Sequence, residues 1–355
     1  MTNFVREEEP PASPIGQRFS DDANILGVFE FKTPMDDSSL VDVLAKIFLN
    51  VNLRSADDPS RPLTFPTSRK QEVREGPSCS GVMRNLSSGL YSITDFCWTV
   101  WKSTFGADAV SPIRPGYPEV QNRPIDISLL EFPMNDIKKM KEKIKGTVND
   151  VISGVIFYGV NLYMHACGHN SKGANVTAIV AVNTRILRAY QTVEEMTKPN
   201  SKAPWGNNIA LLSVAVPMCK DSENVDPLYF IGKTSKTIKA KKNSHGLFLT
   251  GLLLKTMGKV KGPEAIFKYM HKTMKNTSLG ISNLVGPTEQ MMIANHPIDK
   301  FYFVATGGPH SVFFGVVSYM GRLNVIMRTE RGFINPTLMV NCIEKSFQRI
   351  LEAAT

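Results

Sequence analysis

The chain alternates between segments with regular hydrophobic spacing and one long segment without it. Strands are predicted where short runs rich in β-branched and aromatic residues lie between turn residues: 24–33, 126–132, 174–185, 207–218, 278–287, 301–307, 311–320 and 322–330. Helices are predicted where apolar residues recur every three or four positions: 36–51, 83–105, 134–144, 147–164, 264–274 and 334–354. The helix at 147–164 is apolar on almost every side and is therefore expected to be buried.

The hydrophobic pattern fails between residues 52 and 81, where four prolines and many charges replace it. Such a composition is typical of a linker. We therefore predict an N-terminal fragment at 1–55, a linker at 56–125 that contains the amphipathic helix near 83–105, and an α/β domain at 126–355. The last segment mixes strands and helices and is long enough to bury its own core, whereas 1–55 offers one strand and one helix.

Charge and cysteine content narrow the class of protein. Lys and Arg outnumber Asp and Glu by 41 to 32, and a net charge of +9 favours acidic partners such as anionic lipid, nucleic acid or phosphorylated ligands. The five cysteines form no CxxC pair, which disfavours a disulfide framework or a zinc site and fits a reducing compartment. The N-terminus lacks the apolar core of a signal peptide, and no run of eighteen apolar residues predicts a membrane span.

Two segments have both a structural and a membrane interpretation. The helix near 83–105 carries Trp98, Trp101 and Phe105, which either pack on the protein's own core or lie in a membrane interface. The segment "GKTSKTIKAKK" (232–242) is predicted to be a basic loop, either solvated or in contact with lipid headgroups or a nucleotide phosphate. Because aromatic residues do not interleave with these lysines, nucleic-acid binding is not expected.

The histidines offer one candidate for acid–base chemistry. His310, in "ATGGPHSVFF", is either a general base or a residue that caps a turn. His165 and His169 flank Cys167, but Gly168 and Asn170 are typical of a helix end, so a surface loop is expected there rather than a metal site. The sequence contains neither a G-x-S-x-G elbow nor a G-x-G-x-x-G loop, which disfavours a serine hydrolase and a dinucleotide site.

Several motifs in order resemble the plant bifunctional wax ester synthase/diacylglycerol acyltransferases. They are "TVNDVISGVIFYGVNLYM" (147–164), "PWGNNIALLSVAVP" (204–217), "SNLVGPTEQMMIANHPIDKFYF" (282–303) and "VSYMGRLNVIM" (317–327). The similarity covers about 126–355, and a shorter one covers about 8–55 through "EEPPASPIGQRF" and "FKTPMD". The resemblance implies a two-domain α/β fold of the CoA-dependent (chloramphenicol acetyltransferase-like) acyltransferases, here with an incomplete N-terminal domain.

The resemblance also implies a function and a site. It implies transfer of a fatty acyl group from acyl-CoA to a long-chain alcohol or diacylglycerol, with acyl-CoA as substrate and with no cofactor. The residues of the family motifs that it places near the tunnel between the two domains are Asn149, Asp150, Gly154, Asn207, Ser282, Asn283, Gly286 and Pro287. In such a fold Asn149 and Asp150 start a helix packed on the sheet, Asp150 accepts backbone N–H groups, and Gly154 and Gly159 allow close approach. A direct catalytic role for Asn149 or Asp150 is the alternative.

One departure from the family decides between two hypotheses. The family's HHxxxDG signature supplies the histidine base, and this sequence contains no adjacent pair of histidines. Either the chain is a form of an active acyltransferase that lacks the segment expected between 55 and 56, or it is a non-catalytic protein that binds acyl chains, membrane or an intact paralogue. The expected location is the cytosolic side of the endoplasmic reticulum or plasma membrane, with the cytosol as the alternative.

Overall fold

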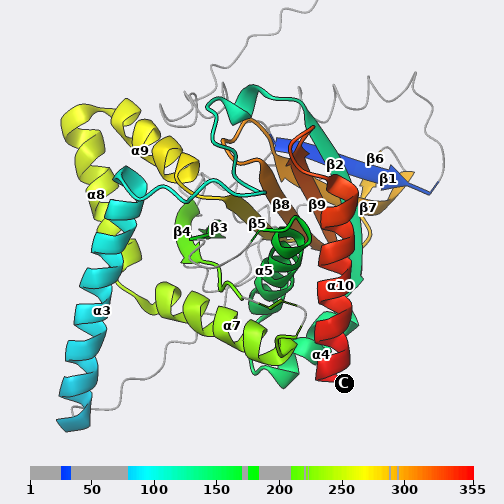
Figure 1. Cartoon of the computed structure of the whole chain (residues 1–355), viewed down its shortest axis with the longest axis horizontal. Helices are drawn as coiled ribbons and strands as arrows, with labels where there is room; N and C mark the ends of the chain where they lie inside the picture. The colour runs from blue at the N-terminus through cyan, green and yellow to red at the C-terminus, as the bar shows by residue number, and fades with distance from the viewer. Residues whose placement is uncertain are drawn as a thin grey trace, which may run out of the picture.

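The computed structural model describes residues 25–32, 79–169, 175–183, 209–219, 221–222, 224–287, 289–293 and 296–355 (Figure 1). Its elements in chain order are β1 (Ile25–Phe31), α3 (Cys79–Thr104), the 3-10 helix η1 (Val120–Asn122), β2 (Ile125–Pro133), α4 (Met134–Lys143), α5 (Val148–Ala166), β3 (Thr177–Asn183), β4 (Ile209–Ala215), α7 (Pro227–Asn243), α8 (Gly246–Lys261), α9 (Pro263–Lys275), β5 (Leu279–Val285), β6 (Met292–Ile293), β7 (His296–Ala305), β8 (Val312–Tyr319), β9 (Arg322–Glu330) and α10 (Pro336–Ala354). The predicted helix at 36–51 and residues 56–78 of the predicted linker lie outside the described residues.

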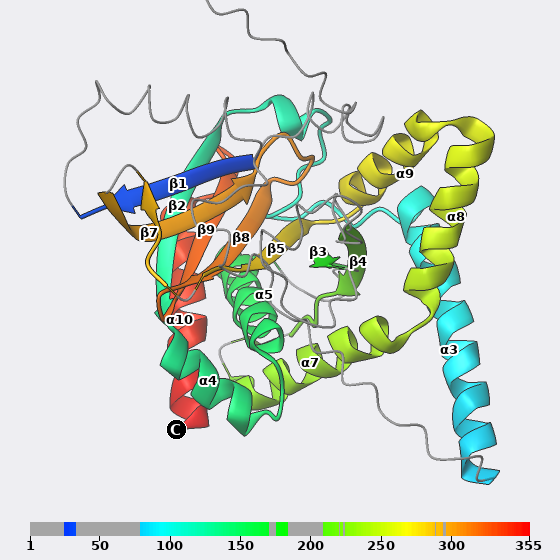
Figure 2. The ribbon, with the colours of Figure 1, turned by 180° about the vertical axis from the view of Figure 1, so that it is seen from behind.

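A six-stranded mixed sheet forms the centre of the molecule. Its strand order is β2-β9-β8-β5-β3-β4, in which β3, β5 and β8 run parallel and the other neighbours run antiparallel. Helices α4, α5, α7 and α10 pack together over one face of this sheet (Figures 1 and 2). The mixed α/β class expected from the sequence is thus confirmed.

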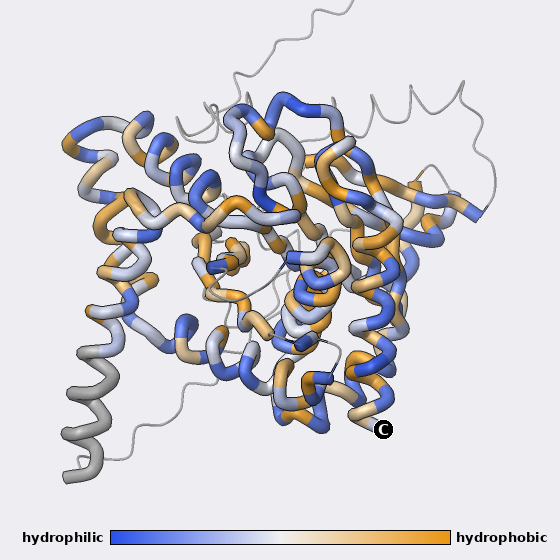
Figure 3. Tube along the Cα trace, viewed as in Figure 1, coloured by the Kyte–Doolittle hydropathy of each residue, from blue (hydrophilic) through white to orange (hydrophobic). Residues whose placement is uncertain are grey.

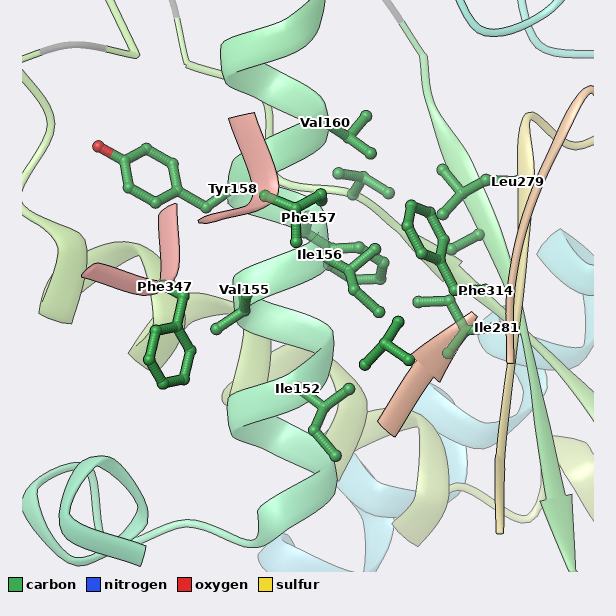
Figure 4. Packing of buried hydrophobic residues seen from close by; sticks show 14 of the residues in the cluster. Ile152, Val155, Ile156, Phe157, Tyr158, Val160, Leu279, Ile281, Phe314 and Phe347 are labelled. Atoms are coloured by element: carbon green, nitrogen blue, oxygen red, sulfur yellow. The ribbon is translucent and has the colours of Figure 1, made fainter. Parts of the chain in front are cut away.

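The buried helix α5 lies at the centre of the hydrophobic core, as its sequence predicted. All residues from Asp150 to Met164 are buried. Figure 4 shows Ile156, Phe157 and Val160 of α5 beside Leu279, Ile281 and Phe314 of the sheet, and Phe347 of α10 beside Val155. Because successive strand residues point to opposite faces, this core contains Leu279 and Ile281 of β5 and Val312, Phe314 and Val316 of β8.

The two glycines of α5 face helices, not the sheet as the sequence analysis expected. A Cβ atom on Gly154 would lie 2.2 Å from Cγ1 of Ile231 in α7, and one on Gly159 would lie 2.4 Å from Cδ1 of Ile343 in α10. The strand-facing side of α5 instead carries bulky side chains. The glycines therefore set how closely α7 and α10 approach α5.

A second, three-stranded sheet packs on the other face of the large sheet. Its order is β1-β7-β6, and β1 pairs antiparallel with β7 from Ile25–Ala305 to Phe31–Ile298. Where β7 crosses β8, a Cβ on Gly315 would lie 1.8 Å from the carbonyl oxygen of Phe303, so only glycine fits. The strand predicted near the N-terminus is therefore confirmed, and it pairs with a strand from the far end of the chain.

The predicted basic loop at 232–242 is wrong, because these residues lie within helix α7. Asp226 caps the helix by accepting a hydrogen bond from the backbone N–H of Leu228 at 2.9 Å, and Pro227 occupies the first turn. Phe230, Ile231 and Ile238 are buried on its inner side. The following helix α8 was not predicted, because its apolar residues follow no clear stripe.

Candidate functional site

The residues singled out by the family motifs gather where the parallel strands end. Asn283 and Gly286 lie at the carboxyl end of β5, and Asn149 lies in the first turn of α5. In open α/β sheets, ligands bind beyond the carboxyl ends of the parallel strands. This end of the sheet is therefore the candidate site, which we call the Asn149–Asn283 cluster.

Two asparagines join α5 to β5 in this cluster. The side-chain Nδ2 of Asn283 donates a short hydrogen bond to Oδ1 of Asn149. Asn149 is exposed, and Asn283 and its neighbour Ser282 are half-buried. This bond uses one donor and one acceptor of the two amides, which leaves the Asn149 Nδ2 group and the Asn283 Oδ1 atom outside this bond.

A close backbone contact shapes the turn after β5. The backbone N–H of Gly286 donates to Oγ of Ser318 in β8 at 3.2 Å. A Cβ on Gly286 would lie 2.2 Å from the carbonyl oxygen of Ser318, so a larger residue does not fit there. Pro287 follows and is half-buried. The glycine and proline of this motif therefore have a positioning role in the structure.

Asp150 holds the start of α5 in place, as expected from the motif. Its Oδ2 accepts a hydrogen bond from the Thr147 backbone N–H at 2.8 Å, and Thr147 Oγ1 accepts one from the Asp150 N–H at 3.2 Å. This reciprocal pair is a capping box. Asp150 is also buried, so its carboxylate has a structural role at the start of α5.

Lysines of α7 lie beside the same helix end. Burial lowers the pKa of Lys242, while the nearby Asp150 carboxylate acts in the opposite direction. Lys239 Nζ donates to the Lys145 carbonyl oxygen at 3.3 Å, next to the loop that enters α5. The cluster therefore combines amides with positive charge, a combination that suits polar or anionic groups.

His310 lies at the opposite end of the sheet. It precedes β8, whereas Val316 of β8 pairs with Asn283. Six residue positions at about 3.3 Å each separate His310 from that pair, or about 20 Å along the strand. The structure thus does not bring His310 together with the family-motif residues, and Asn207 lies outside the described residues.

The His310 ring is buried and fixed by hydrogen bonds. Thr277 Oγ1 donates to the Met274 carbonyl at 2.8 Å, so it accepts the proton of His310 Nε2 at 2.9 Å. Burial lowers the pKa of His310 to about 3, and the charges of Arg328 and Arg114 add to this effect. The neutral imidazole is 4% exposed and is held as part of the interior.

The MHACGH segment ends α5 as expected. α5 stops at Ala166, and Gly168 adopts φ of 71°, a conformation that favours glycine. His165 and Cys167 are exposed. Among the residues the structure describes, no group of three or more His, Cys, Asp or Glu side chains is arranged to hold a metal ion.

A separate pocket of about 400 Å³ lies between the end of β2 and α10. Its lining residues are Glu131, Phe132, Pro133, Asn341, Glu344, Lys345, Phe347 and Gln348. It contains no family-motif residue, so it is not the candidate site.

Sequence reasoning missed Ser318 and Lys242 as parts of the cluster. Ser318 lies within the motif 317–327, and its hydroxyl is fixed by the turn after β5, a contact between strands that sequence spacing does not reveal. Lys242 was assigned to a basic loop, and only the Asp226-Pro227 helix start could have placed it on a helix facing α5.

Taken together, the fold and the cluster define a mixed α/β protein with a polar site at the carboxyl ends of its parallel strands. Residues 205–351 match the family model of the WS/DGAT C-terminal domain. The resemblance read from the sequence motifs is thereby confirmed.

Several curated proteins of similar sequence are named wax ester synthase/diacylglycerol acyltransferases. The chain is 26% identical over 279 residues to wax ester synthase/diacylglycerol acyltransferase 4 of Arabidopsis thaliana, covering 75% of this chain and 53% of that protein. It is 24% identical over 321 residues to wax ester synthase/diacylglycerol acyltransferase 11 of the same plant, covering 83% of this chain and 64% of that protein. The chain thus spans about half the length of the first of these relatives.

Solved structures are similar at lower identity. The wax ester synthase/diacylglycerol acyltransferase of Marinobacter aquaeolei VT8 aligns with a TM-score of 0.48 and 11% identity, covering 90% of this chain and 66% of that one. The epimerization domain from the third module of tyrocidine synthetase B aligns with a TM-score of 0.42 and 11% identity, covering 79% of this chain and 61% of that one.

Proposed function

We propose that this chain takes part in O-acyl transfer, in which a fatty acyl group passes from acyl-CoA to a long-chain alcohol or diacylglycerol. In this proposal the chain contributes substrate binding and not the catalytic base. The observation that carries the proposal is the match of residues 205–351 to the family model of the WS/DGAT C-terminal domain. The Asn149–Asn283 cluster supports it, because motif residues far apart in sequence meet at one strand end.

The chemistry explains why the base is excluded from the proposal. Attack of an alcohol on a thioester needs a base with a pKa near neutrality to accept the hydroxyl proton. The sequence contains no HHxxxDG motif. His310 has a pKa of about 3 because of its burial, and it lies away from the cluster. We therefore do not expect His310 to act as an efficient base for acyl transfer.

An acyl-transfer assay tests this expectation. The purified chain is mixed with radiolabelled palmitoyl-CoA and either hexadecanol or dioleoylglycerol, and ester products are separated by thin-layer chromatography. We expect ester at the level of the protein-free control. Turnover well above that level that is lost in both His310→Ala and His310→Gln, with each variant folded by circular dichroism, would contradict the assignment and identify His310 as a base.

Substrate binding is tested separately. We expect the chain to bind palmitoyl-CoA in isothermal titration calorimetry, and we expect Asn149→Ala combined with Asn283→Ala to weaken binding at least about fivefold through lost hydrogen bonds. Asn135→Ala, on the exposed side of α4, is the matched control. Equal binding by all three proteins would remove the cluster from the proposal.

A second candidate function is favoured by the missing histidine pair. The chain would then act without catalysis, by binding acyl chains or an intact paralogue. Mixing the chain with a catalytically active wax ester synthase distinguishes this role: a change in that enzyme's acyl-transfer rate, together with co-elution, supports a partner function. Co-elution is not expected if the chain acts alone.

The proposed location follows from the proposed lipid substrates. We place the chain on the cytosolic side of the endoplasmic reticulum or plasma membrane, with the cytosol as the alternative. In the described part of the chain, none of the helices combines the length and apolarity needed to cross a bilayer. Fractionation of cells that express the tagged chain, followed by a carbonate wash, tests surface attachment.

A further inference from the structure

The helices α3, α8 and α9 pack on one another at one end of the molecule (Figures 1 and 2). We propose that the outer surface of these three helices, here called the helical end, binds an anionic phospholipid bilayer peripherally. The inference rests on the proposed function in one respect: lipid substrates make a bilayer the expected partner among anionic surfaces. Its geometry and its test are independent of acyl transfer.

Large apolar side chains are exposed on the helical end. On α8, Phe248 is 71% exposed and Leu252 is 51% exposed. At the end of α3, Trp101 is 55% exposed and Phe105 is 80% exposed. Exposed apolar side chains that lie on packed neighbouring helices are candidates for an interaction surface.

Exposed lysines share α8 with Phe248 and Leu252 and continue along α9. On α8, Phe248, Leu252, Lys255 and Lys259 follow one another at steps of four, three and four, so they lie along one stripe of the helix. In Figure 3, hydrophobic and hydrophilic positions both occur along α8 and α9. The exposed lysines of the two helices are Lys255, Lys259, Lys261, Lys268, Lys272 and Lys275. In the sequence from 246 to 275, Glu264 is the only acidic residue.

The apolar and basic residues of the helical end lie close together where α3 meets α9. Lys272 Nζ lies 6.0 Å from the centre of the Phe105 ring. Trp101 packs over Gly106, where a Cβ would lie 2.3 Å from its ring, so the exposed indole has a fixed position. Rigid aromatic groups beside lysines match the boundary between acyl chains and charged headgroups.

The structure keeps Trp101 and Phe105 on this surface but removes two other residues that the sequence suggested, Trp98 and Lys241. Lys241 of α7 is buried against Asp95, with its Nζ 3.9 Å from the centre of the Trp98 ring. Trp98 is therefore covered from within the protein, whereas Trp101 faces outward. Lys241 therefore cannot reach a headgroup, whereas the exposed lysines of α8 and α9 can.

Vesicle sedimentation tests the proposal. The full chain, without acyl-CoA, is mixed with vesicles of phosphatidylcholine containing 30% phosphatidylserine, at low salt, and with vesicles of pure phosphatidylcholine. We expect binding to the anionic vesicles that falls as salt rises, because screening weakens the lysine contribution. Phe248→Ser with Leu252→Ser, and separately Lys255→Gln with Lys259→Gln, should each weaken binding about tenfold or more.

Matched controls change the same chemistry elsewhere. Tyr229→Ser removes an apolar side chain that is 65% exposed on α7, and Lys138→Gln with Lys143→Gln removes exposed charge from α4. These controls should bind like the wild type. No binding to anionic vesicles, equal binding to neutral ones, or equal losses in the controls would each overturn the proposal. Because the assay contains no acyl acceptor, its failure leaves the acyl-transfer proposal untouched.

Discussion

Asp108 is a single carboxylate that connects three other segments of the chain. Its Oδ1 accepts from Lys102 Nζ and from Thr177 Oγ1 at 2.9 Å, and its Oδ2 accepts from the Thr177 N–H at 2.7 Å and from Ser278 Oγ at 2.6 Å. Asp108 is fully buried and Lys102 is 5% exposed. The ion pair therefore has its hydrogen bonds satisfied, and the loss of either charge leaves the other buried and unpaired.

Asp108→Asn should lower the free energy of unfolding by about 3–5 kcal/mol, because it leaves the Lys102 ammonium without its counter-charge. Urea titration followed by circular dichroism measures this. The matched control is Asp136→Asn, whose partner Lys139 lies at 3.0 Å on the exposed side of α4, and this change should cost less than about 1 kcal/mol. Similar losses in the two variants would contradict the assigned role of Asp108.

His310 predicts a dependence of stability on pH. Its folded-state pKa of about 3 is below the value of 6.5 expected when the chain unfolds. Between these values the unfolded state binds the proton and the folded state does not. Stability from this site is therefore fully present above about pH 6.5 and is lost as pH falls, by up to about 1.4 kcal/mol per pH unit.

The measurement compares unfolding free energies from pH 7 to pH 4 in the wild type and in His310→Gln. Carboxylates contribute to both curves, so the difference between the curves isolates His310. We expect a shallower slope in the variant, while His165→Gln, at an exposed position, keeps the wild-type slope. A His310→Gln curve parallel to the wild type would show that His310 titrates normally in the folded protein.

At the scale of elements, helix α5 determines where its neighbours lie. Gly154 and Gly159 form flat patches against α7 and α10, and a methyl group at either position meets a side chain or backbone atom closer than 3 Å. Because the core is close-packed, it cannot compress to accommodate such a contact, and α7 or α10 is forced outward.

Gly159→Ala should therefore destabilise the protein by about 1–3 kcal/mol through overpacking against Ile343. Gly251→Ala is the matched control, because it makes the same change inside helix α8 where a Cβ meets nothing within 4 Å. Without a clash, alanine should stabilise α8 by about 0.5–1 kcal/mol. Thermal unfolding of both variants measures the two changes in stability, which should have opposite signs. A loss of stability in Gly251→Ala would indicate that helix propensity does not explain the contrast.

The elements also show how far the sequence could predict the structure. Segments whose period is unambiguous, such as 134–144 and the strands β8 and β9, were predicted close to their observed limits. Helix α7 was not predicted because its many lysines obscure the apolar spacing of a helix. Its only start signal in the sequence is the Asp226-Pro227 pair. The sequence could place Asn149 and Asn283 only in the same region of the fold. The hydrogen bond between them depends on strand order and side-chain geometry, which the sequence does not reveal.

At the scale of the whole molecule, α3 is attached to the part of the chain that follows it. Asn276 Nδ2 donates to the carbonyl oxygens of Lys102 and Ser103 at 3.0 and 3.1 Å, and Asp95 pairs with Lys241. The helix was assigned to a linker in the sequence analysis, and the domain boundaries remain a prediction. These contacts indicate that the second half of α3 behaves as part of the α/β body.

Limited proteolysis tests this attachment. We expect the proline-rich composition of 52–78 to direct early cleavage there, and we expect the stable product to begin before residue 91 and so retain the second half of α3. Mass spectrometry of the product gives its N-terminus. Asp108→Asn should expose α3 to cleavage, whereas Asp136→Asn should not. A stable wild-type product that starts near residue 126 would show that α3 is a separable linker.

The pairing of β1 with β7 has a consequence for how the protein is made. Phe31 pairs with Ile298 and Ile25 with Ala305, so the two strands are separated by roughly 270 residues in the chain. At about 5–20 residues per second, the ribosome needs roughly 15–50 s after β1 emerges before β7 is available. Throughout that interval β1 has neither its hydrogen-bonding partner nor the ring of Phe301 that stacks on Phe29 at 5.0 Å. The small sheet therefore cannot form before β7 is made, and until then the nascent chain carries β1 as an unpaired strand that is open to pairing with other chains.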